Sequence, residues 1–382
     1  MSPPRLLFVN HVGTMSGAEF VLARVAEAFP GATAFLFEDG PLKTALEGAG
    51  LRTTVSAHGA GLASIRRDRS LLRALPAGYS LAALILGIAS VARRHDVVYA
   101  NSQKAFLLSA LAMNVVRRPL IWHLHDILDG AHFGAAQRRL QVGLANRHAA
   151  RVVVPSAACA DAFAAAGGRR ELVSVVANGV EPPPHRARPS RAALSLPEGP
   201  LLGVFSRLAK WKGQHVVLEA LSEAPGVNAV FAGSALFGED AYARELRARV
   251  GSLGLEERVT FLGQRGDVPD LMAAVDCVVH PSVDPEPFGL TLVEAMFAGT
   301  PVIATDAGAA REILEDGRAG CLVPPGDPAA LAAALRAFFA DLAGAATLTD
   351  HAAKRAAELY SAARMRSDIS ALVRSVVEGA RR

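Results

Sequence analysis

Short apolar runs alternate along this chain with longer segments in which apolar residues recur at helical spacing. The runs that predict strands are residues 6–9, 33–38, 53–55, 97–101, 120–126, 151–156, 201–205, 229–234, 259–263 and 321–326. Strands that alternate with helices form parallel sheets, whose ligands bind at the carboxyl ends of the strands. The pattern therefore predicts an α/β protein built from doubly wound, Rossmann-like domains.

The length of the chain indicates two domains. Its 382 residues are too many for one ordinary core and fit two domains of about 180 residues each. Five prolines within residues 182–197 predict a stiff linker over 182–198. We therefore expect an amino-terminal domain over 1–181, a second domain over 199–362 and a final helix over 363–382.

Two helices are predicted from their apolar residues. Residues 74–92 carry no charge, but Pro76 and Gly78 are expected to break this segment early. The remainder is too short to cross a bilayer, so the pattern predicts an amphipathic core helix. The final helix places six apolar residues on one face: Met365, Ile369, Leu372, Val373, Val376 and Val377.

Cysteine usage and the amino terminus predict where the protein resides. Cys159, Cys277 and Cys321 lie far apart and form neither a metal motif nor a disulfide framework, which indicates a reducing compartment. The amino terminus has a four-residue apolar run, which predicts a strand and not a signal peptide. We expect a cytoplasmic protein, either free or at the inner face of the cytoplasmic membrane.

Charge is distributed unevenly along the chain. Residues 1–180 hold 19 Lys and Arg against 11 Asp and Glu, whereas residues 181–382 hold 21 against 25. The basic excess is clustered at Arg66, Arg67, Arg69, Arg73, Arg93, Arg94, Arg117, Arg118, Arg138 and Arg139. Either these arginines are solvated helix ends, or they contact an anionic surface such as phospholipid headgroups or a lipid-linked phosphate. Nucleic acid is disfavoured because aromatic residues are not interleaved with the charges.

Two carboxylates eight positions apart, Glu286 and Glu294, mark a loop-to-helix junction. Pro285 and Pro287 forbid regular structure around Glu286, and good helix formers follow Gly289. A helix therefore begins near Gly289. Its first N–H groups, those of Phe288, Gly289, Leu290 and Thr291, favour a phosphate there.

Carboxylates beside a phosphate site need partners that donate hydrogen bonds. Glu286 precedes the expected phosphate and Glu294 lies about a turn beyond it, so hydroxyl groups on both sides of a diphosphate would suit them. A nucleotide sugar has this layout. The alternative is that both side chains are solvated, one on a loop and the other on a helix face.

Further candidate residues follow predicted strands. Arg207 and Lys212 come after the strand at 201–205 and could clamp a diphosphate. Asn101, His125 and Asp126 end two strands of the first half, where His125 is expected to share a sheet face with His123. Gly13 and Gly17 stand between the first strand and its helix, as either a tight turn or a phosphate-facing loop.

The segment EPFGLTLVEAM at 286–296 resembles the signature of family 4 of the retaining glycosyltransferases with the GT-B fold. The resemblance extends over nearly the whole chain. It implies two Rossmann-like domains with a cleft between them and a last helix that returns to the first domain. It also implies that activity is the transfer of a sugar from a nucleotide sugar.

The resemblance assigns roles to individual residues. His125 would lie near the donor sugar and the acceptor, and Gly17 would approach the diphosphate, although Ser16 stands where the family often has glycine. Arg207 and Lys212 would grip the diphosphate. The nucleotide base would rest on the loop after residues 259–263, near Gln264 and Arg265. Glu286 would orient sugar hydroxyls, and Glu294 would hold the ribose.

We therefore expect a hexosyltransferase that uses a UDP- or GDP-sugar, retains the anomeric configuration and acts on a glycan or lipid-linked acceptor in polysaccharide or glycolipid synthesis. The chain has no Asp-x-Asp motif, so no metal is expected. The alternatives are a nucleotide-sugar epimerase or hydrolase of the same fold, and a nucleotide-sugar-binding protein without catalysis. A nicotinamide dehydrogenase is disfavoured because the Gly-x-Gly-x-x-Gly fingerprint is missing.

Overall fold

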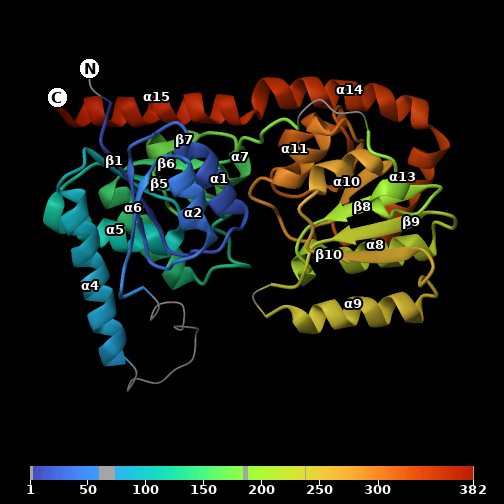
Figure 1. The fold of residues 1–382 in the computed structure, drawn as a ribbon, viewed down its shortest axis with the longest axis horizontal. Helices are drawn as coiled ribbons and strands as arrows, with labels where there is room; N and C mark the ends of the chain where they lie inside the picture. The colour runs from blue at the N-terminus through green and yellow to red at the C-terminus, as the bar shows by residue number, and fades with distance from the viewer. Residues whose placement is uncertain (1–2, 60–73, 184–187, 237, 382) are drawn as a thin grey trace. The chain divides into compact units, whose positions relative to one another are not determined.

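The computed structural model describes residues 3–59, 74–183, 188–236 and 238–381 (Figure 1). The chain divides into two compact units: Met1–Gly179 with Ala362–Arg382, here the N-unit, and Val180–Ser361, here the C-unit. Each unit holds one parallel sheet with helices around it (Figure 1). The predicted arginine cluster at Arg66, Arg67, Arg69 and Arg73 lies outside the described residues.

The N-unit sheet has the strand order β3-β2-β1-β4-β5-β6-β7 in the described part of the chain. Its strands are β1 Leu6–Asn10, β2 Thr33–Leu36, β3 Arg52–Val55, β4 Val97–Ala100, β5 Leu120–His123, β6 Ala149–Val154 and β7 Val173–Val175. Every residue of β1, β4 and β5 is buried. Burial on both faces explains why these strands are continuous apolar runs in the sequence.

Helices cover both faces of this sheet. They are α1 Gly17–Ala26, α2 Pro41–Gly48, α4 Ala74–Ala92, α5 Gln103–Val116, α6 Ala135–His148, α7 Ala157–Ala165 and α15 Ala362–Arg381, with the short 3₁₀ turn η2 Arg170–Leu172. Buried residues of α4, α5, α6 and α7 form one core cluster with one face of the sheet. On the other side, α1 contacts both α2 and α15.

The helix α15 belongs to the N-unit although it ends the chain. Five of the six apolar residues predicted on one face are buried, and Leu372 is half-buried. Arg366 forms an ion pair with Glu27 at the end of α1 at 2.6 Å, and the Met365 sulfur accepts a hydrogen bond from the Gly179 N–H at 3.1 Å. The amphipathic pattern thus predicted the packing face of this helix.

The expected break at Pro76 and Gly78 was wrong, because α4 runs without interruption from Ala74 to Ala92. Proline is tolerated in the first turn of a helix, where its missing N–H has no intrahelical acceptor in any case. Within the described residues, no single helix is long and apolar enough to cross a membrane; one pair, Pro328–Ala340 with Leu342–Leu359, meets the criteria of length and composition jointly but is bent by 100°.

The C-unit sheet has the strand order β10-β9-β8-β11-β12-β13 among the residues described. Its strands are β8 Leu201–Phe205, β9 Asn228–Ala232, β10 Val259–Gly263, β11 Cys277–His280, β12 Val302–Thr305 and β13 Cys321–Val323. The α-helices are α8 Gln214–Ser222, α9 Asp240–Ser252, α10 Val268–Ala274, α11 Leu290–Phe297, α12 Ala310–Ile313, α13 Pro328–Ala340 and α14 Leu342–Leu359, and the 3₁₀ turns are η3 Ala192–Leu194, η4 Lys210–Lys212 and η5 Glu315–Gly317. α8, α9 and α13 share one core cluster with the strands.

Part of the proline-rich segment is held on the C-unit. Arg191 donates to the Ala274 carbonyl at 2.9 Å and forms an ion pair with Asp276 at 2.7 Å. Asp276 also accepts from the Leu201 N–H at 2.8 Å, so Arg191 is tied to the start of β8. The second half of the segment predicted as a linker is therefore fixed to one unit.

Each sheet has a point where the strand order reverses. In the N-unit this point lies between β1 and β4, and in the C-unit it lies between β8 and β11. Loops that leave the carboxyl ends of such neighbouring strands diverge to opposite faces of the sheet and leave a crevice for ligands. Asn101 in the N-unit and Arg207, Lys212 and Glu286 in the C-unit lie on these loops, whereas His125 and Asp126 follow the next strand, β5, and Gln264 and Arg265 follow β10.

Candidate functional site

Two loops of the C-unit, after β8 and after β11, are locked together through their backbones. Gly213 has φ +72°, and a Cβ atom there would lie 1.9 Å from the Pro281 carbonyl oxygen. The Val283 N–H donates to the Trp211 carbonyl at 2.8 Å. Only glycine permits this close approach with a left-handed backbone. The contact fixes Lys212, which precedes Gly213, against the loop that carries Glu286.

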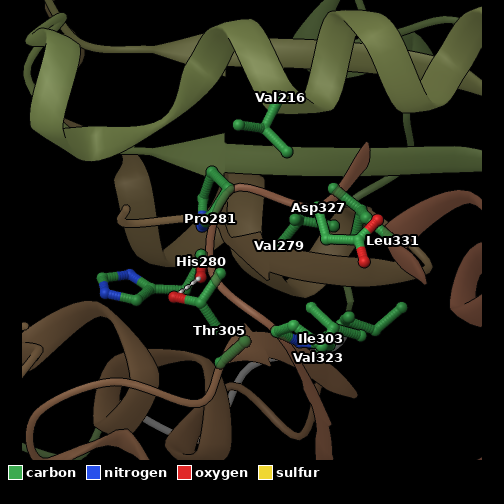
Figure 2. Close-up of a pocket in the computed structure, with 11 residues that line it drawn as sticks. Val216, Val279, His280, Pro281, Ile303, Thr305, Val323, Asp327 and Leu331 are labelled. Carbon is green, nitrogen blue, oxygen red and sulfur yellow. Dashed lines mark hydrogen bonds between the residues drawn. The ribbon is translucent and has the colours of Figure 1, made fainter. Parts of the chain in front are cut away.

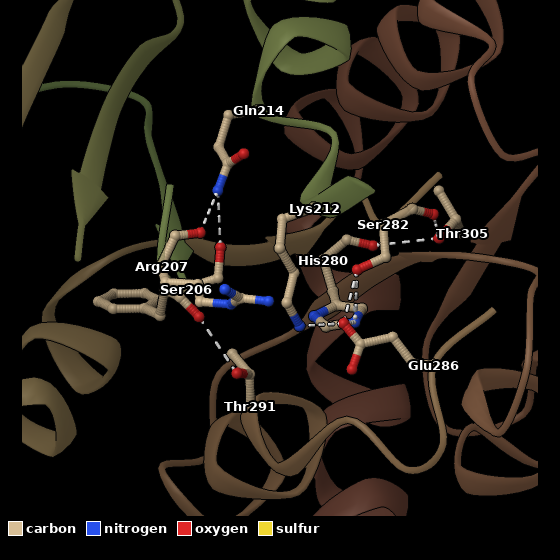
Figure 3. A network of polar contacts seen from close by, with 10 residues as sticks. Ser206, Arg207, Lys212, Gln214, His280, Ser282, Glu286, Thr291 and Thr305 are labelled. Atoms are coloured by element: carbon tan, nitrogen blue, oxygen red, sulfur yellow. Dashed lines mark hydrogen bonds and ion pairs between the residues drawn. The ribbon is translucent and has the colours of Figure 1, made fainter. Parts of the chain in front are cut away.

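Three side chains converge on one oxygen of Glu286 (Figure 3). Lys212 Nζ forms an ion pair with Glu286 Oε1. Ser282 Oγ donates to the same oxygen at 2.7 Å, and His280 Nε2 lies 3.2 Å from it. Glu286 is 7% exposed, so this carboxylate is buried among its partners.

The ionisation of Glu286 is set by these neighbours. Burial alone would raise the pKa of the carboxyl, because a charged group loses its hydration. The charges of Lys212 and His280 and their hydrogen bonds outweigh burial and hold the pKa of Glu286 well below its ordinary value. Glu286 is therefore an anion at neutral pH, with its second oxygen available to accept hydrogen bonds.

A third loop, after β12, fixes the backbone of Glu286. Gly308 has φ +61° and pairs with Glu286 in an isolated bridge; a Cβ atom there would lie 2.2 Å from the Glu286 carbonyl oxygen. The Ala309 N–H donates to that carbonyl at 3.0 Å. Thr305 Oγ1 donates to the Ser282 carbonyl at 2.6 Å (Figure 3). Glu286 is thus held by loops from three neighbouring strands.

Arg207 is placed by the end of β8. Its guanidinium forms an ion pair with Glu239 at 3.0 Å and lies 5.4 Å from the centre of the Trp211 ring. Gln214 Nε2 donates to the Arg207 carbonyl at 2.8 Å (Figure 3). Lys212 Nζ lies over the same Trp211 ring at 4.2 Å. The two cations that the sequence singled out therefore share the Trp211 ring as a neighbour.

The helix α11 begins at Leu290, at the place that the sequence predicted. Gly289 is its N-cap with φ +86°, a conformation that glycine adopts without strain. The first N–H groups of a helix have no intrahelical acceptor, so those near Phe288, Leu290 and Thr291 suit an anion. Phe288 is buried with its ring against Tyr360, and Thr291 Oγ1 donates to the Phe205 carbonyl at 3.1 Å. 

Glu294 and the residues expected near the nucleotide base occupy separate positions in the C-unit. Glu294 is half-buried one turn along α11. Arg265 follows β10 and is held by Asp267 through two hydrogen bonds, one of 2.7 Å. Gln264 accepts from Ser234 Oγ at 3.3 Å. Gln264 and Arg265 therefore lie on the loop after β10, and Gln264 is tied to Ser234 on the loop after β9.

A pocket behind these loops is a packing feature (Figure 2). Its lining residues include Val216, Val279 and Leu331, and it leaves no space for a water molecule. In Figure 2 the imidazole of His280 points away from Asp327 and Leu331. His280 therefore contributes its backbone to this packing and its side chain to the Glu286 cluster.

Two of the N-unit candidates, Asn101 and His125, belong to a polar network at the ends of β1, β4 and β5. His125 Nε2 lies 2.9 Å from Asn101 Oδ1. Asn101 Nδ2 donates to Asn10 Oδ1 at 3.3 Å, and Asn10 Nδ2 donates to Glu19 Oε1 at 3.3 Å. Asn10, Asn101 and Glu19 are buried. Gly17 is the first residue of α1 and is exposed.

His123 and His125 differ in their surroundings. The strand β5 ends at His123, so residues 124–126 were wrongly predicted as strand. The two rings nevertheless lie 3.9 Å apart between centres. His123 is buried with its Nδ1 2.8 Å from the Tyr99 hydroxyl, whereas His125 is half-buried. Burial lowers the pKa of His123 well below its usual value and that of His125 to about 3, so both rings are neutral at pH 7.

Asp126 lies beside His125 in a different set of contacts. Gln103 Nε2 donates to Asp126 Oδ2 at 2.7 Å, and Gln141 Nε2 donates to Gln103 Oε1 at 2.5 Å. Burial raises the pKa of Asp126. Asp126 is thus tied to α5 and α6 through the glutamines.

The sequence did not single out several residues of these clusters. His280 and Ser282 hold the Glu286 carboxylate, and Asn10 and Glu19 extend the network of His125. Asn10 could have been found because it is a polar residue at the end of a buried strand. His280 carried the same signal, because it is the last residue of the buried strand β11, but the sequence does not show that its side chain turns toward Glu286, six residues later. No group of three or more His, Cys, Asp and Glu able to hold a metal ion occurs in the described part of the chain.

Comparisons with known proteins identify families for both units. Residues 188–357 match the family described as glycosyl transferases group 1, and residues 16–179 match the glycosyl transferase 4-like domain. Among curated proteins, the chain is 41% identical over 161 residues to a phosphatidyl-myo-inositol mannosyltransferase of Mycobacterium leprae, which covers 38% of this chain and 41% of that protein. It is 33% identical over 199 residues to the lipopolysaccharide core biosynthesis mannosyltransferase LpcC of Rhizobium leguminosarum, covering 51% and 56%. The chain thus spans about half the length of the curated relatives it matches.

Solved structures extend the similarity to the whole chain. HepE of Anabaena, in complex with UDP and glucose, is 37% identical with a TM-score of 0.86, and the match covers 97% of this chain and 100% of HepE. Sucrose-phosphate synthase of Thermosynechococcus elongatus shares the fold with a TM-score of 0.81 at 21% identity. Because the two family matches fill most of both units and HepE aligns over its full length, the chain belongs to the group 1, GT4-like glycosyltransferases with the GT-B fold.

Proposed function

We propose that this glycosyltransferase transfers a hexosyl unit from a nucleoside-diphosphate sugar to an acceptor hydroxyl, with retention of configuration and without a metal ion. The observation that carries the proposal is the cluster of Lys212 and Glu286 beside the start of α11, at the strand-order reversal of the C-unit. Cations, a helix N-terminus and an ionised carboxylate stand together there. That combination suits a diphosphate joined to a sugar.

The diphosphate would bind to Arg207, Lys212 and the N–H groups of residues 288–291. The Arg207 guanidinium and Lys212 Nζ both lie close to the Trp211 ring, so both cations are available to the oxygens of one diphosphate. Glu294 would hold the ribose hydroxyls, and the base would rest near Gln264 and Arg265. UDP-glucose is the first donor to test, because HepE was crystallised with UDP and glucose; GDP-mannose is the second, because two relatives are mannosyltransferases.

Glu286 would orient the donor sugar. Its ionised carboxylate accepts hydrogen bonds from sugar hydroxyls, while Lys212, Ser282 and His280 hold its other oxygen. These contacts strengthen as the sugar approaches an oxocarbenium ion. Glu286 acts here through hydroxyl groups and forms no covalent bond to the sugar, unlike the nucleophile of a retaining hydrolase.

The bond between the sugar and the diphosphate would break as negative charge grows on the leaving phosphate. The fixed charges of Arg207 and Lys212 stabilise that charge more in the transition state than in the ground state. The acceptor hydroxyl attacks on the face that the phosphate leaves, and a phosphate oxygen takes its proton. This path retains the anomeric configuration. The protein cations supply the positive charge that a metal ion would otherwise supply.

The N-unit would contribute His125 beside the donor sugar and the acceptor, and Gly17 near the diphosphate. His125 is neutral, so it can donate or accept one hydrogen bond to a hydroxyl without adding charge. Asn101 contacts its Nε2, and Asp126 follows it in the chain. The acceptor is a glycan or a lipid-linked saccharide, a proposal supported by relatives that act on phosphatidyl-myo-inositol or the lipopolysaccharide core.

We also propose peripheral contact between the N-unit and an anionic membrane. α4 exposes Tyr79 and Leu86, and α5 exposes Leu111 and Val115. Arg118 at the end of α5 donates to the Arg93 carbonyl at the end of α4 at 2.9 Å, so basic residues gather where these helices end. Val115 comes just before Arg117 and Arg118 in the chain, and apolar side chains next to arginines suit a surface of anionic headgroups. Such contact would place the protein at the inner face of the cytoplasmic membrane.

A screen of nucleotide sugars tests the donor. UDP-, GDP- and ADP-sugars are added to the protein and thermal unfolding is followed, because the native donor stabilises the folded state by mass action. Transfer is then measured with the stabilising donor and lipid or oligosaccharide acceptors. Turnover of the donor that is equally fast without any acceptor would favour the alternative, an epimerase or hydrolase, and donor binding with no turnover would favour a non-catalytic binding protein.

A further inference from the structure

The contact between Asn101 and His125 restricts where the imidazole carries its hydrogen. Asn101 lies directly after β4 and is completely buried. Its Oδ1 is 2.9 Å from His125 Nε2. An amide oxygen can only accept a hydrogen bond, so this contact requires a hydrogen on Nε2. The orientation of the Asn101 amide therefore decides the tautomer of His125.

Backbone carbonyls fix that orientation. Asn101 Nδ2 donates to the Ala18 carbonyl at 3.2 Å and to Asn10 Oδ1 at 3.3 Å. A flipped amide would bring the Asn101 oxygen against the Ala18 carbonyl oxygen, and neither can donate. The amide of Asn10 is oriented in the same way, because its Nδ2 donates to the Val12 carbonyl at 3.0 Å and to Glu19 Oε1 at 3.3 Å. Asn10 is left with its oxygen toward Asn101.

From His125 through Asn101 and Asn10 to Glu19, each residue therefore donates a hydrogen bond to the next. This series of hydrogen bonds ends at Glu19, whose other oxygen accepts from Ser16, the N-cap of α1. His125 is neutral at pH 7 because burial lowers its pKa to about 3, so the ring carries one hydrogen. With that hydrogen on Nε2, Nδ1 holds a lone pair.

We propose that Asn101 is a positioning residue that keeps His125 in the Nε2–H tautomer, so that Nδ1 accepts a hydrogen bond from a substrate hydroxyl. The role of the hydroxyl rests on the proposed function. The tautomer rests only on the contacts of the N-unit. Without Asn101, the two tautomers of imidazole would both be populated, and only one of them could accept through Nδ1.

Nuclear magnetic resonance of the full chain labelled with ¹⁵N-histidine tests the tautomer in the absence of substrate. The signals of His125 are assigned by their loss in His125→Gln. We expect the wild type to show hydrogen on Nε2 and an unprotonated Nδ1. Asn101→Ala is expected to shift His125 toward a mixture of tautomers, whereas Asn114→Ala, an exposed position on α5 bonded only to carbonyls of its own helix, leaves the signals unchanged.

Kinetics then separate positioning from a general loss of structure. Asn101→Ala is expected to lower kcat by about tenfold, the loss of one hydrogen bond, with little change in the dissociation constant of nucleoside diphosphate. Glu19→Gln keeps a carbonyl oxygen for Asn10 and should preserve the tautomer. If Asn101→Ala does not fold, Asn101→Leu, which keeps a side chain of similar size but offers no acceptor to Nε2, should change the His125 signals in the same direction.

Two results would overturn the proposal. The first is a wild-type His125 with hydrogen on Nδ1, and the second is an Asn101→Ala protein whose His125 signals match those of the wild type. A protein that shows the expected tautomer but transfers no sugar would leave Asn101 with this role and would overturn the proposed function instead. The two failures are therefore distinguishable.

Discussion

Among single residues, the contacts of Glu286 determine its proposed role. One of its oxygens is occupied by Lys212, Ser282 and His280, and the carboxylate stays ionised although it is buried. A buried anion is tolerated because its partners compensate for lost hydration. The same partners leave the other oxygen to a ligand. Substitution of Glu286 should therefore change both kcat and the free energy of unfolding, and the two effects can be measured separately.

Substitution of Glu286 and substitution of Glu294 should have different effects on catalysis and binding. Glu286→Gln is expected to lower kcat with little change in the affinity for nucleoside diphosphate, because the proposed contacts of Glu286 are to the sugar. Glu294→Gln is expected to weaken the binding of donor and nucleoside diphosphate alike, by about 1.5 to 3 kcal/mol, because a charged hydrogen bond to the ribose is exchanged for a neutral one.

Calorimetry with nucleoside diphosphate and steady-state kinetics measure both effects. Glu257→Gln, at an exposed position, is the matched control and should change neither. Loss of nucleoside diphosphate binding in Glu286→Gln but not in Glu294→Gln would mean that the donor lies in the opposite direction along the loop.

Stability should depend on pH through Glu286. Folding lowers the pKa of this group below its ordinary 4.5, so ionisation stabilises the folded state above that pH, and the contribution is lost as pH falls toward the folded pKa. We expect Glu286→Gln to unfold at lower denaturant concentration than the wild type at about pH 7, with a difference that shrinks by about pH 3. Denaturant titrations at both pH values check this; an equal difference at both would show that charge is not the cause.

At the scale of elements, three loops of the C-unit meet at Glu286. Gly213 allows the β8 loop to touch the β11 loop, and Gly308 allows the β12 loop to touch Glu286 itself. Both glycines have positive φ and backbone atoms within the volume of a Cβ atom. The position of the carboxylate is thus determined by backbone packing between loops as well as by its side-chain partners.

Gly308→Ala should displace Glu286 and lower kcat. The new methyl group would overlap the Glu286 carbonyl, and the left-handed backbone adds strain. Gly326→Ala is the control, because Gly326 also has a left-handed backbone at φ +71° but nothing within 4 Å of its Cβ position. If both variants lose the same activity and stability, backbone strain alone explains the effect and the contact with Glu286 has no role.

The sequence predicted elements well where one physical signal dominated. Gly289 between prolines and helix formers located α11, and the amphipathic face of α15 located its packing surface. The break predicted at Pro76 was wrong because the effect of proline depends on its place within a helix. In the first turn it does not interrupt the helix. β5 was predicted too long because Leu124 and His125 repeat the alternation of Trp122 and His123. The strand nevertheless ends at His123, and the His125 side chain bonds to Asn101.

The polar clusters could be predicted only in part. Strand ends pointed to Asn101 and His125, and spacing pointed to Glu286 and Lys212. The pairing of Lys212 with Glu286 depends on the approach of two loops 74 residues apart in the chain, through the backbone of Gly213. Such an approach is a property of the folded backbone and has no local pattern in the sequence.

At the scale of the whole molecule, the uneven charge of the chain leads to a test of membrane contact. We expect the protein to float with liposomes that contain anionic lipid, and we expect binding to weaken between about 0.05 and 0.5 M salt as charges are screened. Replacing Arg93 and Arg117 together by glutamine should reduce binding, whereas replacing Arg169 and Arg170, also exposed in the N-unit but beyond α7, should not. No flotation at low salt, together with rapid transfer to a neutral soluble acceptor, would remove the proposal.

We propose that this chain transfers a sugar from a nucleotide sugar with retention, using protein cations in place of a metal. The most direct measurement is the anomeric configuration of the transferred sugar, determined by nuclear magnetic resonance of the product formed in the presence of EDTA. From an α-linked donor such as UDP-glucose or GDP-mannose, the account predicts an α-linked product at undiminished rate in the chelator. A β-linked product would contradict retention, and activity that EDTA abolishes and Mg²⁺ or Mn²⁺ restores would contradict the role given to Arg207 and Lys212.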